Sequence, residues 1–338
     1  MSARKPKVTV LGGGSWGTAV ASIAARNTEV LQWLRDPDIA EAINTKHENP
    51  RYLPGMTLTR SLRATADLDQ AVAAADVIVA AVPSQHLRGV LESVGEHVRP
   101  WIPVVSLVKG LEQGTSKRMT EIINEVLPGH PAGVLSGPNI AKEVVAGYAA
   151  AATIAMPDLT TATMLQGLFH VPWYRVYTSE DVLGVEIAGA LKNPLAIAVG
   201  FGDGLGAGDN TRAMVITRAL HELTRLGVAM GGRPETFTGL AGMGDLIATC
   251  TSPLSRNRTV GYELGRGKTL DDIIAGMNQV AEGVKSAGVV VSLARAHGVD
   301  TPIFDEVDAV INHGKSVEST YRGLLREAPG HEVHGEGW

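Results

Sequence analysis

The stretch KVTVLGGGSWG, residues 7–17, decides the architecture of the first half of the chain. The apolar run Lys7–Leu11 predicts a strand, and the alanine-rich segment Ser15–Arg26 predicts a helix. Between them, Gly12, Gly14 and Gly17 fit the spacing G-x-G-x-x-G. Glycines in this arrangement permit a tight turn, a close approach of backbone to a pyrophosphate, and close packing of the helix on the strand. The stretch therefore predicts a dinucleotide-binding unit, and a glycine-rich turn without a ligand is the alternative.

Further short apolar runs alternate with helical patterns along the first half of the chain. The expected strands are Glu29–Leu34, Val77–Val82, Val104–Val108, Gly133–Leu135 and Tyr174–Tyr177. Continuous apolar strands that alternate with helices predict a parallel sheet covered on both faces, the doubly wound α/β class. We expect this first domain to span residues 1–179.

The pattern changes near Ser179, after which long helical stretches follow and no confident strand is found. The expected helices are Asp181–Ala198, Arg212–Met230, Thr259–Leu264, Ala281–His297 and Phe304–Ile311. These stretches predict an all-helical second domain over residues 180–326. Residues 327–338 show no periodicity, and we expect a poorly ordered tail there.

Size and composition exclude several classes of protein. The 338 residues exceed the ~250–300 that one hydrophobic core usually holds. A net charge of -5 without a dense basic run argues against a nucleic-acid binder. The single cysteine, Cys250, fits a reducing compartment. The apolar start is cut short by glycines, and Ala149–Met156 is too short to span a bilayer, so we expect a cytoplasmic protein without membrane insertion.

Lys192 stands in a helical segment that is apolar nearly all round, within Gly189-Ala190-Leu191-Lys192-Asn193-Pro194. Such a helix is buried. Its lysine either snorkels to the surface, which is the commoner arrangement, or faces a cleft, where desolvation tunes a lysine towards proton transfer.

Two further segments of the second half carry candidate functional groups. Glycines bracket Asp245 in Gly239–Asp245, so its carboxylate can bind a substrate hydroxyl, hold an ammonium group or simply cap the next helix. Ser255-Arg256-Asn257-Arg258 precedes a predicted helix. Arginine is electrostatically unfavourable at a helix N-terminus unless an anion lies between them, so this segment is either a phosphate site or a solvated basic turn.

Lys109 and the segment Ser136-Gly137-Pro138-Asn139 each follow the carboxyl end of a predicted strand, where ligands of doubly wound sheets bind. The residue that reads the cofactor ribose is expected about 20 positions after the glycine loop. Arg35 and Asp36 stand there: Arg35 would pair with the 2′-phosphate of NADP, whereas Asp36 would favour NAD.

Taken in order, these motifs resemble one family. From Val8 to about Leu325 the chain is similar to the soluble bacterial NAD(P)-dependent glycerol-3-phosphate dehydrogenases. The matching segments are Gly12–Gly17, Val82–Ser84, Lys109–Glu112, Ser136–Pro138, Ala190–Asn193, Gly242–Leu246 and Ser255–Arg258, with Gln279–Gly283 also similar. The resemblance implies reversible reduction of dihydroxyacetone phosphate to sn-glycerol 3-phosphate, which feeds phospholipid synthesis.

The resemblance also implies roles for individual residues. Lys192 matches the lysine that exchanges a proton with the reacting oxygen, and no metal ligand is implied. The implied substrate contacts are Lys109, Gly137, Asn139, Lys192, Asn193, Asp245, Ser255, Arg256 and Asn257. The implied cofactor contacts are Gly12, Gly14, Ser15, Trp16, Gly17, Arg35, Lys109, Ala141, Arg256, Val280 and Glu282. The cofactor is expected to be NADP or NAD, and Arg35 at the ribose position favours NADPH. Asn139 departs from the serine or threonine common in the family.

Two alternatives to this function remain from the residues alone. A related dehydrogenase acting on a β-hydroxyacid would bind a carboxylate through arginine instead of a phosphate. A non-catalytic redox sensor would bind the cofactor without requiring Lys192. Members of the family are often dimers, so we expect a homodimer. The expected substrate is a small phosphorylated molecule.

Overall fold

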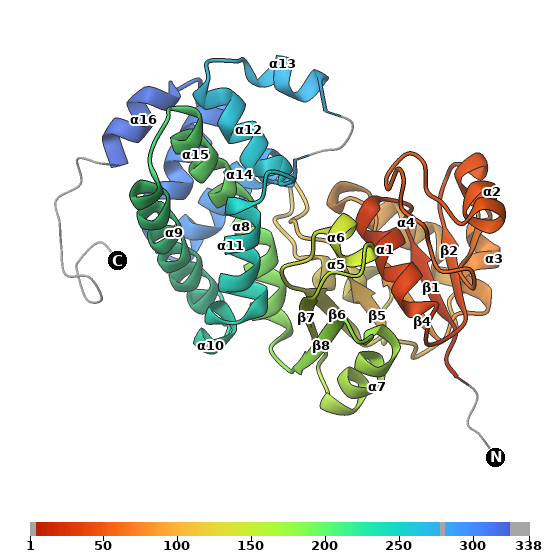
Figure 1. The fold of residues 1–338 in the computed structure, drawn as a ribbon. Helices are drawn as coiled ribbons and strands as arrows, with labels where there is room; N and C mark the ends of the chain where they lie inside the picture. The colour runs from red at the N-terminus through yellow and green to blue at the C-terminus, as the bar shows by residue number, and fades with distance from the viewer. Residues whose placement is uncertain (1–4, 278–280, 325–338) are drawn as a thin grey trace. The chain divides into compact units, whose positions relative to one another are not determined.

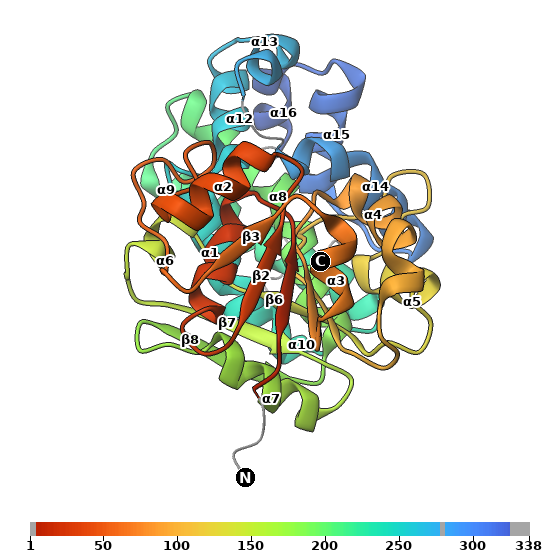
Figure 2. The same ribbon diagram turned by 90° about the vertical axis from the view of Figure 1, so that its right-hand side faces the viewer.

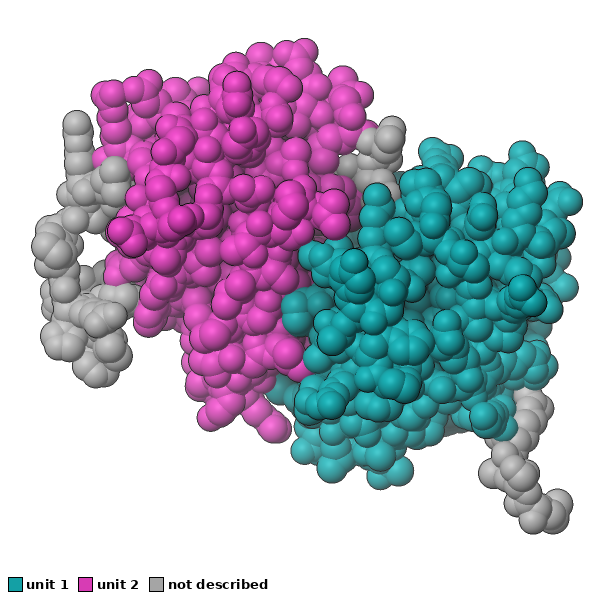
Figure 3. Space-filling model, viewed as in Figure 1, with its two compact units in different colours: residues 1–108, 117–182 teal, residues 109–116, 183–338 magenta. Residues whose placement is uncertain are grey.

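The computed structural model describes residues 5–277 and 281–324. The chain divides into two compact units (Figure 3). Unit 1 comprises the described residues up to Val108 together with Lys117–Val182. Unit 2 comprises Lys109–Ser116 and the described residues from Leu183 onward. The short segment Lys109–Ser116, expected in the first domain, thus groups with the second unit. The tail predicted at residues 327–338 lies outside the described residues.

Unit 1 is built on an eight-stranded sheet in the order β3-β2-β1-β4-β5-β6-β7-β8. Its strands are β1 (Val8–Leu11), β2 (Val30–Trp33), β3 (Arg63–Thr65), β4 (Val77–Ala80), β5 (Val104–Ser106), β6 (Ala132–Ser136), β7 (Ala150–Ala155) and β8 (Tyr174–Ser179). Neighbouring strands are parallel except for β6 and β7, which pair antiparallel. The predicted doubly wound α/β class is confirmed, and the antiparallel pair corrects the expectation of a wholly parallel sheet.

Helices cover both faces of this sheet (Figures 1 and 2). They are α1 (Ser15–Ala24), α2 (Pro37–Lys46), α3 (Leu68–Ala73), α4 (Leu87–Val94), α5 (Met119–Val126), α6 (Ala141–Val145) and α7 (Leu159–Phe169), with short 3-10 turns at Ser84–His86 and Gly95–His97. Alternate residues of a strand point to opposite faces. In β4, Val77 and Val79 therefore join a core with α1 and α7, while Ile78 and Ala80 join one with α3, α4 and α5.

The named elements of unit 2 are all helices among its described residues. They are α8 (Val182–Gly204), α9 (Asp209–Ala229), α10 (Pro234–Thr238), a π-helical turn (Leu240–Gly244), α11 (Asp245–Thr251), α12 (Arg256–Gly265), α13 (Leu270–Ala275), α14 (Glu282–Ala296), α15 (Pro302–His313) and α16 (Val317–Leu324). Each of the five helices expected from the sequence overlaps one of these.

Helix α8 is the central helix of unit 2 and runs continuously through Pro194. In the described part of the chain it is the one helix long and apolar enough to cross a bilayer, yet 89% of its apolar window is buried inside the protein. The core helix of a globular protein meets the same criteria of length and composition. Lys192 and Asn193 stand in this buried helix.

Candidate functional site

The glycine loop of unit 1 has the backbone geometry that its spacing predicts. Gly12 has φ +128°, and a Cβ there would lie 2.6 Å from the Ala81 carbonyl oxygen. A Cβ on Gly17 would lie 2.8 Å from the Gly12 carbonyl oxygen, so α1 packs directly on the loop. A Cβ on Gly14 would meet nothing within 4 Å. Gly12 and Gly17 are thus required by packing, whereas Gly14 leaves open space beside the start of α1.

Two buried amides orient this loop, and the sequence pattern gave no signal for either. Gln32 of β2 donates from Nε2 to the Gly12 carbonyl oxygen at 2.9 Å. Asn49 donates from Nδ2 to the Gly13 carbonyl oxygen at 2.9 Å. Both amides also bond the Thr18 hydroxyl. Because the loop carbonyls are bonded to these amides inside the unit, the loop is held in one conformation.

The start of α1 has the features that a dinucleotide requires. Gly14 is the N-cap residue and provides no side-chain cap, so the first N–H groups of the helix are available to a phosphate. The indole Nε1 of Trp16 is buried without a hydrogen-bond partner among the described residues, and a bound ligand would satisfy such a donor. Ser15 donates to the Tyr52 carbonyl oxygen at 2.9 Å. These residues fit a nicotinamide dinucleotide.

Arg35 and Asp36 follow the end of β2 and differ in what they bind. The Asp36 carboxylate caps α2, accepting from the backbone N–H groups of Asp38 at 3.1 Å and Ile39 at 3.4 Å. Arg35 is exposed. The carboxylate that would read a ribose hydroxyl is therefore already bonded to the backbone, and the guanidinium is the accessible group at this position.

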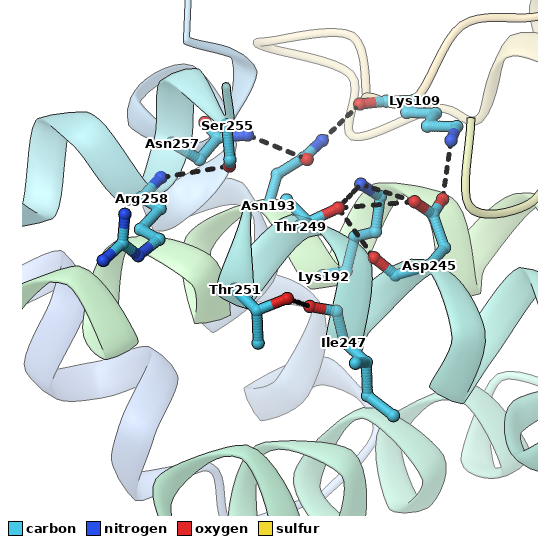
Figure 4. A network of polar contacts seen from close by, with 10 residues as sticks. All are labelled: Lys109, Lys192, Asn193, Asp245, Ile247, Thr249, Thr251, Ser255, Asn257 and Arg258. Carbon is cyan, nitrogen blue, oxygen red and sulfur yellow. Dashed lines mark hydrogen bonds and ion pairs between the residues drawn. The ribbon is translucent and has the colours of Figure 1, made fainter. Parts of the chain in front are cut away.

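In unit 2, Lys192 is 4% exposed, and the expectation that it snorkels to the surface is wrong. Its ammonium lies 3.0 Å from Oδ1 of Asp245 and donates to the Thr249 hydroxyl (Figure 4). That hydroxyl donates to the Asp245 carbonyl oxygen at 2.7 Å. Lysine from α8 and aspartate from α11 thus form a buried pair, and a threonine one turn after the aspartate contacts both.

Lys109 is the second cation on the same carboxylate. Its Nζ lies 2.6 Å from Oδ2 of Asp245, so the two ammonium groups occupy the two carboxylate oxygens (Figure 4). Burial lowers the pKa of Lys109 to about 8, with the Asp245 carboxylate opposing the change and the Lys192 charge adding to it. Of the roles considered for Asp245, holding an ammonium group is the one observed.

Local backbone geometry explains how Asp245 reaches this position. The π-helical turn Leu240–Gly244 leads directly into α11, whose first residue is Asp245. A Cβ on Gly242 would lie 2.0 Å from the Phe237 carbonyl oxygen, so the turn cannot close on α10 with a larger residue. Packing therefore requires Gly242, whereas a Cβ on Gly239 would come no closer than 3.4 Å to its neighbours. The tight turn at Gly242 leads into α11 and so sets the position of the Asp245 carboxylate.

A chain of amides joins the Lys109 segment to three helices. Asn193 donates to the Lys109 carbonyl oxygen at 2.8 Å. Asn257 donates to Oδ1 of Asn193 at 2.9 Å, and its own Oδ1 accepts from the Gly283 N–H at 2.9 Å (Figure 4). These bonds connect α8, α12 and α14, so Asn193 and Asn257 position neighbouring groups whether or not they also contact a ligand.

The predicted basic turn forms the start of α12. Ser255 is its N-cap residue, with its hydroxyl accepting from the Arg258 N–H at 3.3 Å. Arg258 pairs with Asp203 at 2.7 Å and is a structural residue. Arg256 is the first residue of the helix; it is exposed and interacts electrostatically with Glu282, the first residue of α14. No acidic side chain lies in the first turn of α12, which leaves a positive helix terminus.

Of the remaining predicted site residues, three lie in unit 1 and one lies outside the described residues. Gly137 directly follows β6 with φ +151°, and a Cβ there would lie 2.9 Å from the Ala151 carbonyl oxygen, so packing against β7 explains this glycine. Both amide atoms of Asn139 are buried without a hydrogen-bond partner among the described residues. Ala141 is the first residue of α6. Val280 lies outside the described residues.

Unit 1 has a dinucleotide-type loop on a doubly wound sheet, and unit 2 has a buried lysine–aspartate pair beside a basic helix terminus. These features define the class of nicotinamide-dependent dehydrogenases with a helical second domain. Residues 7–162 match the family model described as the N-terminus of NAD-dependent glycerol-3-phosphate dehydrogenase, and residues 181–322 match the family model of its C-terminus. The chain belongs to the NAD-dependent glycerol-3-phosphate dehydrogenase family.

Individual relatives agree with the family models. Glycerol-3-phosphate dehydrogenase (NAD(P)+) of Mycobacterium avium is 62% identical over 336 residues, covering 99% of this chain and 98% of the relative. The crystal structure of the Coxiella burnetii glycerol-3-phosphate dehydrogenase matches with a TM-score of 0.91 at 34% identity, covering 96% of this chain and 99% of that one. The Saccharomyces cerevisiae enzyme matches with a TM-score of 0.84 at 32% identity, covering 96% and 100%.

Proposed function

We propose that this oxidoreductase interconverts dihydroxyacetone phosphate and sn-glycerol 3-phosphate with NAD(P), and that Lys192 exchanges the proton at the reacting oxygen. The observation that carries this assignment is the pair of Lys192 and Asp245, 3.0 Å apart, with both side chains at most 6% exposed. A buried ammonium group held by a carboxylate is a strong hydrogen-bond donor to a developing alkoxide.

The proton and the hydride have separate sources. A reduced nicotinamide, when held by the glycine loop of unit 1, would supply the hydride that the carbonyl carbon of the substrate needs. Lys192 donates its proton to the carbonyl oxygen as negative charge develops there, which leaves a neutral amine until a proton returns from solvent. The Asp245 carboxylate holds the Lys192 ammonium group, and the Thr249 hydroxyl fixes the direction of its Nζ. General acid catalysis of this kind contributes about 10²–10⁴-fold.

Lys109 adds a second positive charge beside the same carboxylate, 2.6 Å from Asp245. We assign it to the binding of substrate and cofactor, because a lysine whose pKa is near 8 is largely protonated at neutral pH. Asn193 and Asn257 hold its backbone and the start of α12 in one hydrogen-bonded chain. Asp245 therefore balances two cations that differ in role.

The substrate phosphate is assigned to the start of α12. Arg256 offers a guanidinium, and Ser255 stands at the helix terminus, where backbone N–H groups and the helix dipole favour an anion. The binding energy of the phosphate orients the carbonyl at Lys192. In unit 1, the buried amide of Asn139, which has no hydrogen-bond partner among the described residues, and the backbone of Gly137 are assigned to the substrate as well.

The cofactor is assigned to the glycine loop, with Gly12, Gly14, Ser15, Trp16 and Gly17 around the pyrophosphate. Arg35 at the end of β2 is assigned to the adenosine ribose, because Asp36 caps α2. A guanidinium at this position favours the 2′-phosphate of NADPH. Lys109, Ala141, Arg256, Val280 and Glu282 complete the cofactor assignment that the family resemblance implies.

We infer a cytoplasmic homodimer that supplies sn-glycerol 3-phosphate for phospholipid synthesis. The buried free thiol of Cys250 suits a reducing compartment. The direct test follows absorbance at 340 nm with NADPH or NADH and dihydroxyacetone phosphate, beside a panel of β-ketoacids that carry a carboxylate and no phosphate. We expect the cofactor to be oxidised when dihydroxyacetone phosphate is the substrate and not when a β-ketoacid is. Turnover of a ketoacid in preference would point to the hydroxyacid class, and binding of cofactor without turnover would point to a sensor.

A further inference from the structure

We propose that Asp203 is a positioning residue that fixes the start of α12 relative to Lys192, and so sets the affinity for the substrate phosphate. Its side chain is 4% exposed. Oδ2 accepts from Nε of Arg258 at 2.7 Å, and a second nitrogen of the same guanidinium also lies 2.7 Å away. Oδ1 binds Arg212 of α9 at 2.8 Å. The inference rests on the proposed phosphate site at Ser255 and Arg256.

Asp203 and Lys192 belong to the same helix, so the contact of Asp203 links that helix to the start of α12. Asp203 lies on α8, about three turns after Lys192. The same helix bonds the start of α12 twice: Asn193 accepts from Asn257, and Asp203 accepts from Arg258. The helix that carries the proton donor therefore holds two consecutive residues of the turn that carries Arg256. A shift of that turn against α8 would alter the distance between phosphate site and proton donor.

Backbone contact between the two helices leaves little freedom other than sliding or rotation. A Cβ on Gly200 of α8 would lie 2.3 Å from the Arg258 carbonyl oxygen, and one on Gly261 of α12 would lie 2.0 Å from that of Ile197. Glycine contacts fix the depth of packing but give no preferred rotation. The planar, two-nitrogen contact of Arg258 with Asp203 supplies that direction.

The two arginines bound to Asp203 differ in their other partners, and this difference allows a positioning role to be tested apart from general stabilisation. A buried ion pair is weak evidence for stability, because its desolvation offsets much of its attraction. Arg212 also pairs with Asp209 at 2.6 Å, so it has a second carboxylate beside Asp203. Arg258 has Asp203 as its ion-pair partner. Arg212→Gln removes the arginine of α9 from the same carboxylate and leaves the bonds to α12 in place, which makes it the matched control.

The test compares Asp203→Asn with Arg212→Gln in steady-state kinetics. For Asp203→Asn, the KM for dihydroxyacetone phosphate should rise by about tenfold, the factor that corresponds to ~1.4 kcal/mol of lost binding. Inhibition by inorganic phosphate should weaken by a similar factor, while kcat and the KM for NADPH stay near wild type. Asp203→Glu should recover part of the affinity, and Arg212→Gln should leave the KM for the substrate unchanged.

The outcomes separate this inference from the proposed function. A wild-type protein that does not turn over dihydroxyacetone phosphate would remove the proposed function itself. An active wild type with an unchanged KM in Asp203→Asn, or with an equal rise in Arg212→Gln, would overturn the positioning role. If Asp203→Asn does not fold, as judged by its circular dichroism and melting curve, Arg258→Lys decides. It keeps the charge and loses the two-nitrogen contact, so an unchanged substrate KM there would also overturn the proposal.

Discussion

Replacing Asp245 by asparagine removes the carboxylate charge that lies between Lys109 and Lys192. The carboxylate is 3% exposed and lies 2.6 Å from one ammonium group and 3.0 Å from the other. Asparagine has nearly the same shape, so the substitution tests charge and leaves the packing at the end of the π-helical turn intact. We expect the variant to bind cofactor and to lose most turnover at neutral pH.

The magnitude follows from the charges around Lys109. Burial already lowers its pKa to about 8, and the Asp245 carboxylate acts in the opposite direction. An opposite charge at this distance shifts a pKa by about 1–3 units, so losing it should lower the pKa of Lys109 by that amount. Each unit corresponds to ~1.4 kcal/mol. In the variant, Lys109 would then be largely neutral at pH 7.5.

The assay is the pH profile of kcat/KM for dihydroxyacetone phosphate, with wild type and Asp245→Asn measured under saturating NADPH. If substrate binding needs protonated Lys109, activity is high below its pKa and falls as pH rises through it. The fall should occur near pH 8 in the wild type. In the variant it should lie about 1–3 units lower. Asp308→Asn, a buried aspartate of α15 bonded to Asn312, is the control and should keep the wild-type profile.

The pH dependence of stability provides an independent check on the direction in which the pKa of Lys109 changes in Asp245→Asn. The folded-state pKa of Lys109 lies below its unfolded value in the wild type and further below it in the variant. The pH range in which the unfolded state binds more protons, and in which stability rises with pH, therefore extends to lower pH in the variant. The loss of melting temperature relative to wild type should therefore be larger at pH 6 than at pH 9. A profile that coincides with the wild type, together with a pH-independent loss of stability, would refute the charge-balancing role of Asp245.

Three other substitutions test separate assignments. Arg256→Ala should raise the KM for dihydroxyacetone phosphate by about tenfold or more, since charged hydrogen bonds are worth ~1.5–3 kcal/mol, and should weaken inhibition by sulfate; an unchanged KM would make Arg256 a solvated turn residue. Arg35→Ala should lower kcat/KM for NADPH and leave that for NADH nearly unchanged; a strong NADH preference unaffected by the substitution would contradict the ribose assignment. Burial raises the pKa of Glu222 to about 8, although hydrogen bonds from the backbone N–H groups of Ile303 and Phe304 act in the opposite direction. Between pH 4.5 and 8 the folded state therefore binds one more proton than the unfolded state, and stability falls as pH rises. The melting temperature of Glu222→Gln should therefore fall less between pH 5 and pH 8 than that of the wild type. An equal fall in both proteins would show that another group causes the pH dependence.

The main elements of the fold were predictable because their signals are local. Apolar runs predicted β1, β2, β4, β5 and β6 to within a few residues, because these strands are largely buried on both faces. β8 was predicted from the alternation of Tyr174 and Val176, which are buried, with exposed Arg175 and Tyr177. The short edge strand β3 (Arg63–Thr65) carries only three residues and no apolar run, and it was missed. β7 (Ala150–Ala155) was missed as well, because alanine has a low preference for strands; its pairing with β6 and β8 is what makes it a strand.

The candidate site was predictable as a set of residues but not as a set of contacts. Nothing local to Lys192 indicates that Asp245 lies 3.0 Å from it, since 52 intervening residues separate them along the chain. That distance decides between a snorkelling lysine and a buried pair. Gln32 and Asn49, which hold the glycine loop, carry no motif of their own. Such roles arise from packing between segments, which sequence periodicity does not encode.

The central claim is that Lys192 donates the proton to the reacting oxygen, and single-turnover reduction by Lys192→Met tests it most directly. Enzyme preloaded with NADPH is mixed with saturating dihydroxyacetone phosphate, and loss of absorbance at 340 nm reports the chemical step apart from product release. We expect NADPH to bind with nearly wild-type affinity and the chemical step to slow by about 10²–10⁴-fold, the contribution of general acid catalysis. A variant that keeps more than about a tenth of the wild-type rate would contradict the assignment.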